Sequence, residues 1–194
     1  TMKQLSEVAA EARKHNLKLH LDGARIFNAV VETKDSTQEI GKLFDTISVC
    51  LSKGLGAPVG SLLITSKENL NKAKRVRKVF GGGMRQSGFL AAAGIYALDN
   101  NVEKLKEDHR RAKNIEMILK ELNYVDSCLS VETNIIMFKL DDKKSVPDFL
   151  NYLSKNNIKG YQFGKQTVRF VTHLDFTDSM LEKLNNTLNN YWSL

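Results

Sequence analysis

A nearly continuous run of apolar and β-branched residues at positions 45–51 (DTISVCL) constrains the fold of this chain more than any other feature. A strand without polar alternation is typical of a sheet that helices cover on both faces. A shorter strand pattern lies at residues 17–21, after a stretch at residues 2–15 with apolar side chains at helical spacing. Residues 60–65 predict another short buried strand. Together these patterns predict an α/β fold.

Each of the first two predicted strands ends at a side chain suited to chemistry. Asp22 follows the first, and Lys53 lies in the turn SKGLGAP after the second. Ligands of α/β sheets bind beyond the carboxyl ends of the strands. A lysine that is desolvated there has a lowered pKa, and its free amine can attack an aldehyde. Taken separately, a surface lysine and a helix-capping aspartate explain the two residues equally well.

The pair is more informative than either residue. A carboxylate for the ring nitrogen and a lysine for the aldehyde are the two groups that pyridoxal phosphate (PLP) requires from a protein. Asp22 and Lys53 supply them, each directly after a predicted strand. The sequence therefore leads to the hypothesis that Asp22 and Lys53 belong to a PLP site.

The second half of the chain has a different pattern. A glycine cluster at residues 81–83 precedes an alanine-rich helix, and a long charged helix at residues 102–122 can bridge two domains. A strand, a helix, a hairpin and a final helix are predicted beyond residue 123, at residues 134–140, 146–153, 158–171 and 177–191. This arrangement predicts a small α+β domain.

Composition narrows the class of protein. The net charge is +7, with 29 Lys and Arg against 22 Asp and Glu, but Lys and Glu are mixed along the helices and no block of five Lys or Arg residues stands out. We therefore predict no nucleic-acid interface, and the lack of a long apolar run predicts no membrane helix. Cys50 and Cys128 fit no metal-ligand spacing, so we expect buried reduced thiols, no metal site and a cytoplasmic protein.

Four segments carry a resemblance to a known family. HLDGARIFNA, SVCLSKGLGAPVGS, GGGMRQSGFLAAAGIYAL and VRFVTH resemble successive blocks of the low-specificity L-threonine aldolases. The resemblance implies the α/β PLP-dependent transferase-like fold (fold type I). Residues 1–108 would then be the C-terminal part of the large mixed-sheet domain, and residues 109–194 the small α+β C-terminal domain.

The resemblance also implies the reaction. These enzymes are aldehyde-lyases of glycine biosynthesis that cleave L-threonine or L-allo-threonine to glycine and an aldehyde by a retro-aldol reaction. They act as homo-oligomers, so a dimer or a homotetramer is expected here. The alternatives are another fold-type-I reaction (β-elimination, transamination or serine hydroxymethyl transfer) and an incomplete, non-catalytic fragment that acts as an assembly partner.

Five residues match the family's cofactor site. Asp22 matches the partner of the pyridine nitrogen, and Lys53 matches the lysine that binds the cofactor aldehyde covalently. Ser52 matches a hydroxyl near the phosphate. Lys78 and Arg85 match basic residues that reach a cofactor phosphate, typically in the neighbouring subunit.

Two arginines match the family's substrate site. Arg25 matches an arginine near the cofactor's phenolic oxygen and the substrate carboxylate, and it is expected at both groups. Arg169 matches the arginine that grips the substrate carboxylate, and a planar guanidinium suits that bidentate contact. His173, close by, is expected to be structural.

One part of the family pattern is not in these 194 residues. In the family, an earlier segment supplies the phosphate loop, the histidine stacked on the cofactor ring and a candidate base. The chain is therefore expected to be a piece of a longer protein and to hold part of the site.

Overall fold

The structure, a computed structural model, describes residues 1–191. The chain forms two compact units, Thr1–Glu103 and Lys104–Leu194. The predicted domains, residues 1–108 and 109–194, concern the complete protein and stay a prediction. None of the helices within residues 1–191 is long and apolar enough to cross a membrane.

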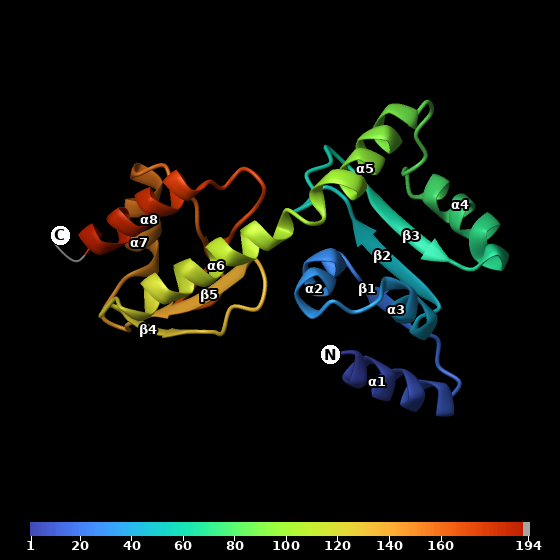
Figure 1. The fold of residues 1–194 in the computed structure, drawn as a ribbon, viewed down its shortest axis with the longest axis horizontal. Helices are drawn as coiled ribbons and strands as arrows, with labels where there is room; N and C mark the ends of the chain where they lie inside the picture. Colours follow the sequence, from blue (N-terminus) through green and yellow to red (C-terminus); the bar gives the residue numbers. More distant parts are fainter. Residues whose placement is uncertain (192–194) are drawn as a thin grey trace. The chain divides into compact units, whose positions relative to one another are not determined.

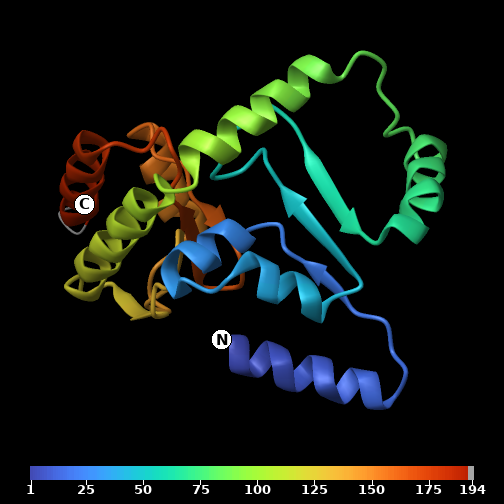
Figure 2. The same ribbon diagram turned by 45° about the vertical axis from the view of Figure 1, so that its right-hand side comes forward.

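The first unit is built around a three-stranded sheet of order β1-β2-β3. β1 and β2 are parallel, and β3 runs antiparallel to β2, as Figures 1 and 2 show. The predicted α/β class is therefore confirmed. The elements of this unit are α1 (Met2–Lys14), β1 (His20–Asp22), α2 (Ile26–Thr33), α3 (Thr37–Leu43), β2 (Thr46–Cys50), β3 (Ser61–Thr65), the 3-10 turn η1 (Lys67–Asn69), α4 (Leu70–Val79) and α5 (Gly88–Asn101).

The central strand β2 has the burial that its sequence predicts. Ile47 and Val49 are buried, and the other three residues of the strand are half-buried, so both faces of the strand are covered. The prediction of burial for β3 was wrong. Leu62, Leu63 and Ile64 are 44%, 53% and 52% exposed. β3 is the edge of this sheet, and its apolar side chains have too few neighbours within the described residues to be covered.

The second unit contains a four-stranded antiparallel sheet of order β4-β5-β7-β6. The small α+β architecture predicted from the sequence is present here, with β4 as a strand that the sequence pattern did not reveal. The predicted long helix at residues 102–122 is shorter. The elements of this unit are α6 (Leu105–Lys120), β4 (Val125–Cys128), β5 (Ile135–Leu140), α7 (Val146–Lys155), β6 (Tyr161–Gln162), β7 (Thr167–Val171) and α8 (Asp178–Asn190).

This second unit has a core of its own. α6 presents Ala112, Ile115 and Leu119 at helical spacing, and all three are at most 1% exposed. They pack in one cluster with inward-facing residues of β5 and β7 and of helices α7 and α8. Tyr124 belongs to the same cluster, and its hydroxyl donates to the backbone oxygen of Leu188 at 2.8 Å. Burial raises the pKa of Tyr124, so this donor stays protonated.

The two cysteines are free but only half-buried. The expectation of fully buried thiols was therefore wrong. Cys50 is the last residue of β2 and Cys128 the last residue of β4, where the strands leave the covered part of their sheets. Burial still raises the pKa of the Cys128 thiol, which keeps it protonated and unreactive.

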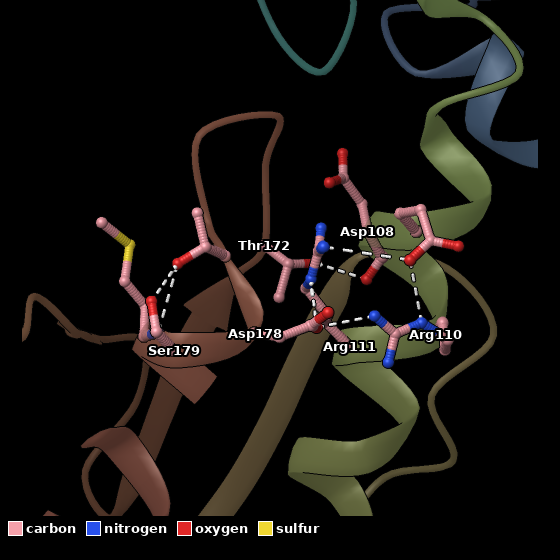
Figure 3. A network of polar contacts seen from close by, with 9 residues as sticks. Asp108, Arg110, Arg111, Thr172, Asp178 and Ser179 are labelled. Carbon is pink, nitrogen blue, oxygen red and sulfur yellow. Dashed lines mark hydrogen bonds and ion pairs between the residues drawn. The ribbon is translucent and has the colours of Figure 1, made fainter. Parts of the chain in front are cut away.

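A polar network joins α6 to Thr172, just after β7, and to Asp178, the first residue of α8 (Figure 3). Asp178 accepts from Nη2 of Arg110 at 2.6 Å and from Nε of Arg111 at 2.9 Å. The hydroxyl of Thr172 donates to the backbone oxygen of Asp108 at 2.8 Å. The Asp108 side chain is different from its neighbours, because it is 2% exposed and its Oδ2 has no hydrogen-bond partner within residues 1–191.

Burial raises the pKa of Asp108 to about 6, although the charges of His173 and Arg111 act in the opposite direction. A carboxyl whose pKa is raised on folding holds its proton longer in the folded state. The free energy of unfolding therefore falls as pH rises from about 4 to about 6, and the cost of the buried charge is complete above that range.

We expect Asp108→Asn to remove this cost, since the amide has the same shape and no charge. At pH 7 the variant should be more stable than the parent by about 2 to 3 kcal/mol, a gain that vanishes near pH 4. Unfolding curves measured from pH 4 to 8 test this. Asp178→Asn is the matched control, because the two arginines lower the pKa of Asp178 and its loss should destabilise at neutral pH. Parallel pH profiles for the parent and Asp108→Asn would contradict the prediction.

Candidate functional site

Asp22 is the last residue of β1, at the carboxyl end of the parallel pair. Its side chain is exposed, and its Oδ1 accepts from the backbone N–H of Ala24 at 3.1 Å. This short turn leads into α2, for which Arg25 is the N-terminal boundary residue. The local hydrogen bond fixes the direction of the carboxylate and leaves its other oxygen open to a ligand.

Gly23 lets β1 end close against β2. A Cβ at this position would lie 2.8 Å from the backbone oxygen of Ser48 and 3.2 Å from Cγ2 of Ile47. Atoms do not approach a backbone oxygen that closely, so any side chain here forces the tip of β1 away from β2. The position of Asp22 therefore depends on the glycine that follows it.

We expect Gly23→Ala to displace Asp22 and lower the free energy of unfolding by about 1 to 3 kcal/mol. Urea unfolding measures the loss of stability. Gly41→Ala is the matched control, because Gly41 lies in α3 and a Cβ there meets nothing within 4 Å. That variant should be neutral or slightly stabilising. Equal behaviour of the two variants would contradict the close-approach argument.

Ser52 and Lys53 lie in the loop that follows β2. Because β1 and β2 are parallel, this loop and Asp22 leave the sheet at the same edge. Both side chains are exposed. The desolvation that the sequence argument expected for Lys53 is therefore not found, because no part of residues 1–191 covers it.

The backbone of this loop is firmly held. Leu51 accepts from the N–H of Ala57 at 3.0 Å, and its own N–H donates to the oxygen of Gly60 at 3.0 Å. The buried amide of Asn101, at the end of α5, donates to the oxygen of Leu55 at 2.8 Å. The loop is thus closed at its base and attached to a helix, while Lys53 projects from a fixed backbone.

Lys78 and Arg85 are the two remaining predicted site residues of this unit. Lys78 lies near the end of α4, and Arg85 lies in the segment between α4 and α5. Both are exposed. No hydrogen bond or ion pair within residues 1–191 joins either residue to Asp22 or Lys53. The structure therefore groups Asp22, Ser52 and Lys53 at one edge and leaves the two basic residues apart from them.

Arg169 belongs to the second unit. It lies in β7, opposite Met137 of β5 and Tyr161 of β6. The side chain is half-buried, its Nε has no hydrogen-bond partner among residues 1–191, and its Cζ lies 5.8 Å from the centroid of the Phe163 ring. Because Nε is buried, only the terminal N–H groups of this guanidinium can meet an anionic ligand, and no carboxylate within residues 1–191 pairs with them.

The sequence analysis missed a charged cluster in the first unit. It lies at the amino end of β2, opposite to the carboxyl end where Asp22 and Lys53 lie. Asp45, just before β2, accepts from the N–H of Leu19 at 2.9 Å, from Arg13 at 2.7 Å and from Lys18 at 3.2 Å. These contacts hold the pKa of Asp45 well below its usual range. The signal was a lone aspartate before a buried strand, which periodicity alone cannot distinguish from a loop residue.

The two cavities described here do not contain the predicted site residues. One of about 560 Å³ lies beside Asp45, and one of about 480 Å³ lies in the second unit beside Phe170 and Leu184. None of the predicted site residues lines either cavity. Asp22 and Lys53 therefore lie on an open edge of the structure, not in an enclosed pocket.

The residues at this edge fit PLP by their chemistry. Asp22 has a carboxylate oxygen free for a ring nitrogen, Lys53 has a free amine for an aldehyde, and Ser52 adds a hydroxyl. The close approach at Gly23 and the attached loop hold these groups on rigid elements. A carboxylate, an amine and a hydroxyl are the kinds of group that PLP uses for its ring nitrogen, its aldehyde and its phosphate.

Solved structures with the same fold are PLP-dependent enzymes of fold type I. A threonine aldolase from Leishmania major has a TM-score of 0.79 at 19% identity, covering 98% of this chain and 56% of its own. Histidinol-phosphate aminotransferase from Clostridium acetobutylicum has a TM-score of 0.70 at 15% identity, covering 98% of this chain and 59% of its own. The predicted fold class is therefore confirmed.

Sequence comparison narrows the class to a family. Residues 1–143 match the family model described as beta-eliminating lyase, and the chain belongs to that family. It is 42% identical over 180 residues to the low specificity L-threonine aldolase of Escherichia coli (strain K12), covering 93% of this chain and 53% of that protein. It is 39% identical over 176 residues to low-specificity L-threonine aldolase 1 of Arabidopsis thaliana, covering 89% and 49%. The resemblance predicted from the four segments is confirmed, and the chain spans about half the length of the curated relatives it matches.

Proposed function

We propose that this protein is a PLP-dependent lyase that cleaves L-threonine or L-allo-threonine to glycine and an aldehyde. The observation that carries the proposal is the joint position of Asp22 and Lys53 at one edge of a parallel strand pair. The 42% identity to an E. coli protein named low specificity L-threonine aldolase supports the choice of reaction.

The cofactor residues have separate tasks in this proposal. Asp22 would hold a proton on the ring nitrogen, Lys53 would bind the cofactor aldehyde covalently, and Ser52 would donate to the phosphate. When bound, PLP supplies an electron sink for the pair released from the broken carbon–carbon bond. Asp22 is suited to its task because one carboxylate oxygen is fixed by Ala24 and the other is free.

The substrate residues orient the bond that breaks. Arg169 and Arg25 hold the substrate carboxylate, and a bidentate contact restricts its rotation. Holding the carboxylate in one orientation would select which of the bonds at Cα is placed for cleavage.

The remaining assignments concern the assembled protein. Lys78 and Arg85 are exposed and apart from Asp22, which suits basic residues that reach the phosphate of a neighbouring subunit. We infer a homodimer or homotetramer on this basis. We propose a cytoplasmic location because both cysteines are free thiols. Within it, residues 1–108 would complete the large domain, and residues 109–194 would form the small one.

A second candidate reaction is β-elimination, since the matching family model is described as beta-eliminating lyase. This reaction uses the same Asp22 and Lys53 but cleaves the bond from Cβ to its leaving group. The products distinguish the two reactions. Threonine cleavage gives glycine and acetaldehyde, whereas elimination from threonine gives ammonia and a 2-oxo acid.

The test uses the full-length protein supplied with PLP. L-threonine, L-allo-threonine and L-serine are assayed for acetaldehyde, glycine and ammonia. Acetaldehyde and glycine in equal amounts from the first two substrates support the proposal. Ammonia without glycine would replace it by β-elimination. A protein that binds no PLP and turns over neither substrate would be a non-catalytic assembly partner instead.

A further inference from the structure

The hairpin of β6 and β7 carries two exposed aromatic side chains next to Arg169. Tyr161 is 64% exposed and Phe163 is 65% exposed. Single exposed aromatic residues are common and need no explanation by themselves. Phe163 differs from Tyr161 because its ring contacts a residue of the proposed substrate site, with Cζ of Arg169 5.8 Å from the ring centroid.

The position of this ring is set by a well-bonded turn. The N–H of Phe163 donates to the oxygen of Thr167 at 2.8 Å, which closes the hairpin. The side-chain amide of Gln162 donates to the oxygens of Gly164 at 3.0 Å and Lys165 at 3.2 Å. The turn is therefore ordered by its own hydrogen bonds, and the ring projects from a defined point of the backbone.

The guanidinium of Arg169 is held differently from those of the other arginines in this unit. Arg110 and Arg111 are held by the carboxylate of Asp178. For Arg169, no carboxylate partner exists among residues 1–191, and its buried Nε makes no hydrogen bond there. Among residues 1–191, the structure shows a cation–π contact between this guanidinium and the Phe163 ring in place of an ion pair.

The two kinds of contact have different consequences for a ligand. A carboxylate partner occupies the N–H edge of a guanidinium, which is the edge that a bidentate ligand needs. An aromatic ring attracts the cation through its π face and leaves N–H donors unused. A ring can therefore restrict Arg169 without competing with a substrate carboxylate.

We propose that Phe163 is a positioning residue for Arg169, which restricts its guanidinium by ring contact and keeps the N–H edge open for a substrate carboxylate. This inference rests on the proposed role of Arg169 in binding substrate. Restricting a long side chain before binding reduces the entropy that the ligand must overcome, so the effect belongs in substrate affinity and not in the chemical step.

The direct test measures KM and kcat for L-threonine in the full-length PLP-loaded protein. Phe163→Leu should raise KM about 2- to 5-fold with kcat unchanged, which is the range of an exposed cation–π contact. Phe163→Tyr keeps the ring face and should restore the parent KM. Met117→Ala is the control, because it removes a similarly exposed apolar side chain from α6 of the same unit. An equal rise in KM for Met117→Ala would overturn the proposal.

A double-substitution cycle separates this inference from the proposed function. In an Arg169→Ala background, Phe163→Leu should have no further effect on KM. The same four proteins are unfolded thermally, and a coupling of about 2- to 5-fold in the unfolding constant reports the ring contact without any activity. An inactive parent would overturn the proposed function. Absence of the coupling in unfolding would overturn the inference about Phe163, whether or not the parent is active. Coupling in unfolding without an effect on KM would show a structural contact and overturn the positioning role.

Discussion

Lys53→Ala is expected to abolish threonine cleavage and the visible absorbance of covalently bound PLP, while leaving the fold intact. No other lysine lies in the loop after β2, so no nearby amine replaces it. The loss of a covalent catalytic group should reduce kcat by more than about 10³-fold. Stability should change little, because the side chain is exposed and projects from a loop held by its backbone and by Asn101.

The measurements are acetaldehyde release, the visible spectrum with PLP and the thermal midpoint. Lys67→Ala is a suitable control, because this lysine is also exposed in the same unit but lies in η1. Its spectrum and activity should match those of the parent. Aldehyde production by Lys53→Ala at a tenth of the parental rate or more would remove Lys53 from the proposed site.

Arg169→Ala is expected to give the second-largest loss, and to give it mainly in KM. Two charge-assisted hydrogen bonds to a carboxylate contribute about 1.5 to 3 kcal/mol each, so KM should rise by about 10²-fold or more. Because the side chain makes no hydrogen bond to described residues through its buried Nε, its removal should not unravel a local network.

Steady-state kinetics with L-threonine measure this prediction. Arg110→Ala is the matched control in the same unit, since Arg110 pairs with Asp178 and Glu107 and has no proposed part in substrate binding. That variant should change stability and leave KM near the parental value. An unchanged KM in Arg169→Ala would exclude the carboxylate clamp.

The sequence predicted where Asp22 and Lys53 lie relative to the strands. Asp22 and Lys53 each follow an apolar strand, and the parallel pairing of β1 and β2 brings them to one edge as expected. Burial was predicted less well. Lys53 and the β3 residues Leu62 and Leu63 are exposed, because burial depends on what covers a strand end or a sheet edge. A local pattern carries no information about that cover.

Other features were beyond the reach of sequence patterns. Asp108 lies on a helix among ordinary charged neighbours, and only tertiary packing makes it a buried carboxyl with an unpaired oxygen. The ring contact between Phe163 and Arg169 joins two residues across a hairpin turn, and its geometry depends on hydrogen bonds within that turn. Neither feature has a signature in hydrophobic periodicity.

The hydrogen bond from Asn101 to Leu55 has a practical consequence for dividing the chain. Asn101 is the last residue of α5, and the first compact unit ends at Glu103. A first-unit fragment cut before Asn101 would lose the amide that supports the Lys53 loop, leaving the buried oxygen of Leu55 without this donor. A fragment or fusion joint that preserves the loop must therefore keep α5 whole and place the new terminus after Glu103.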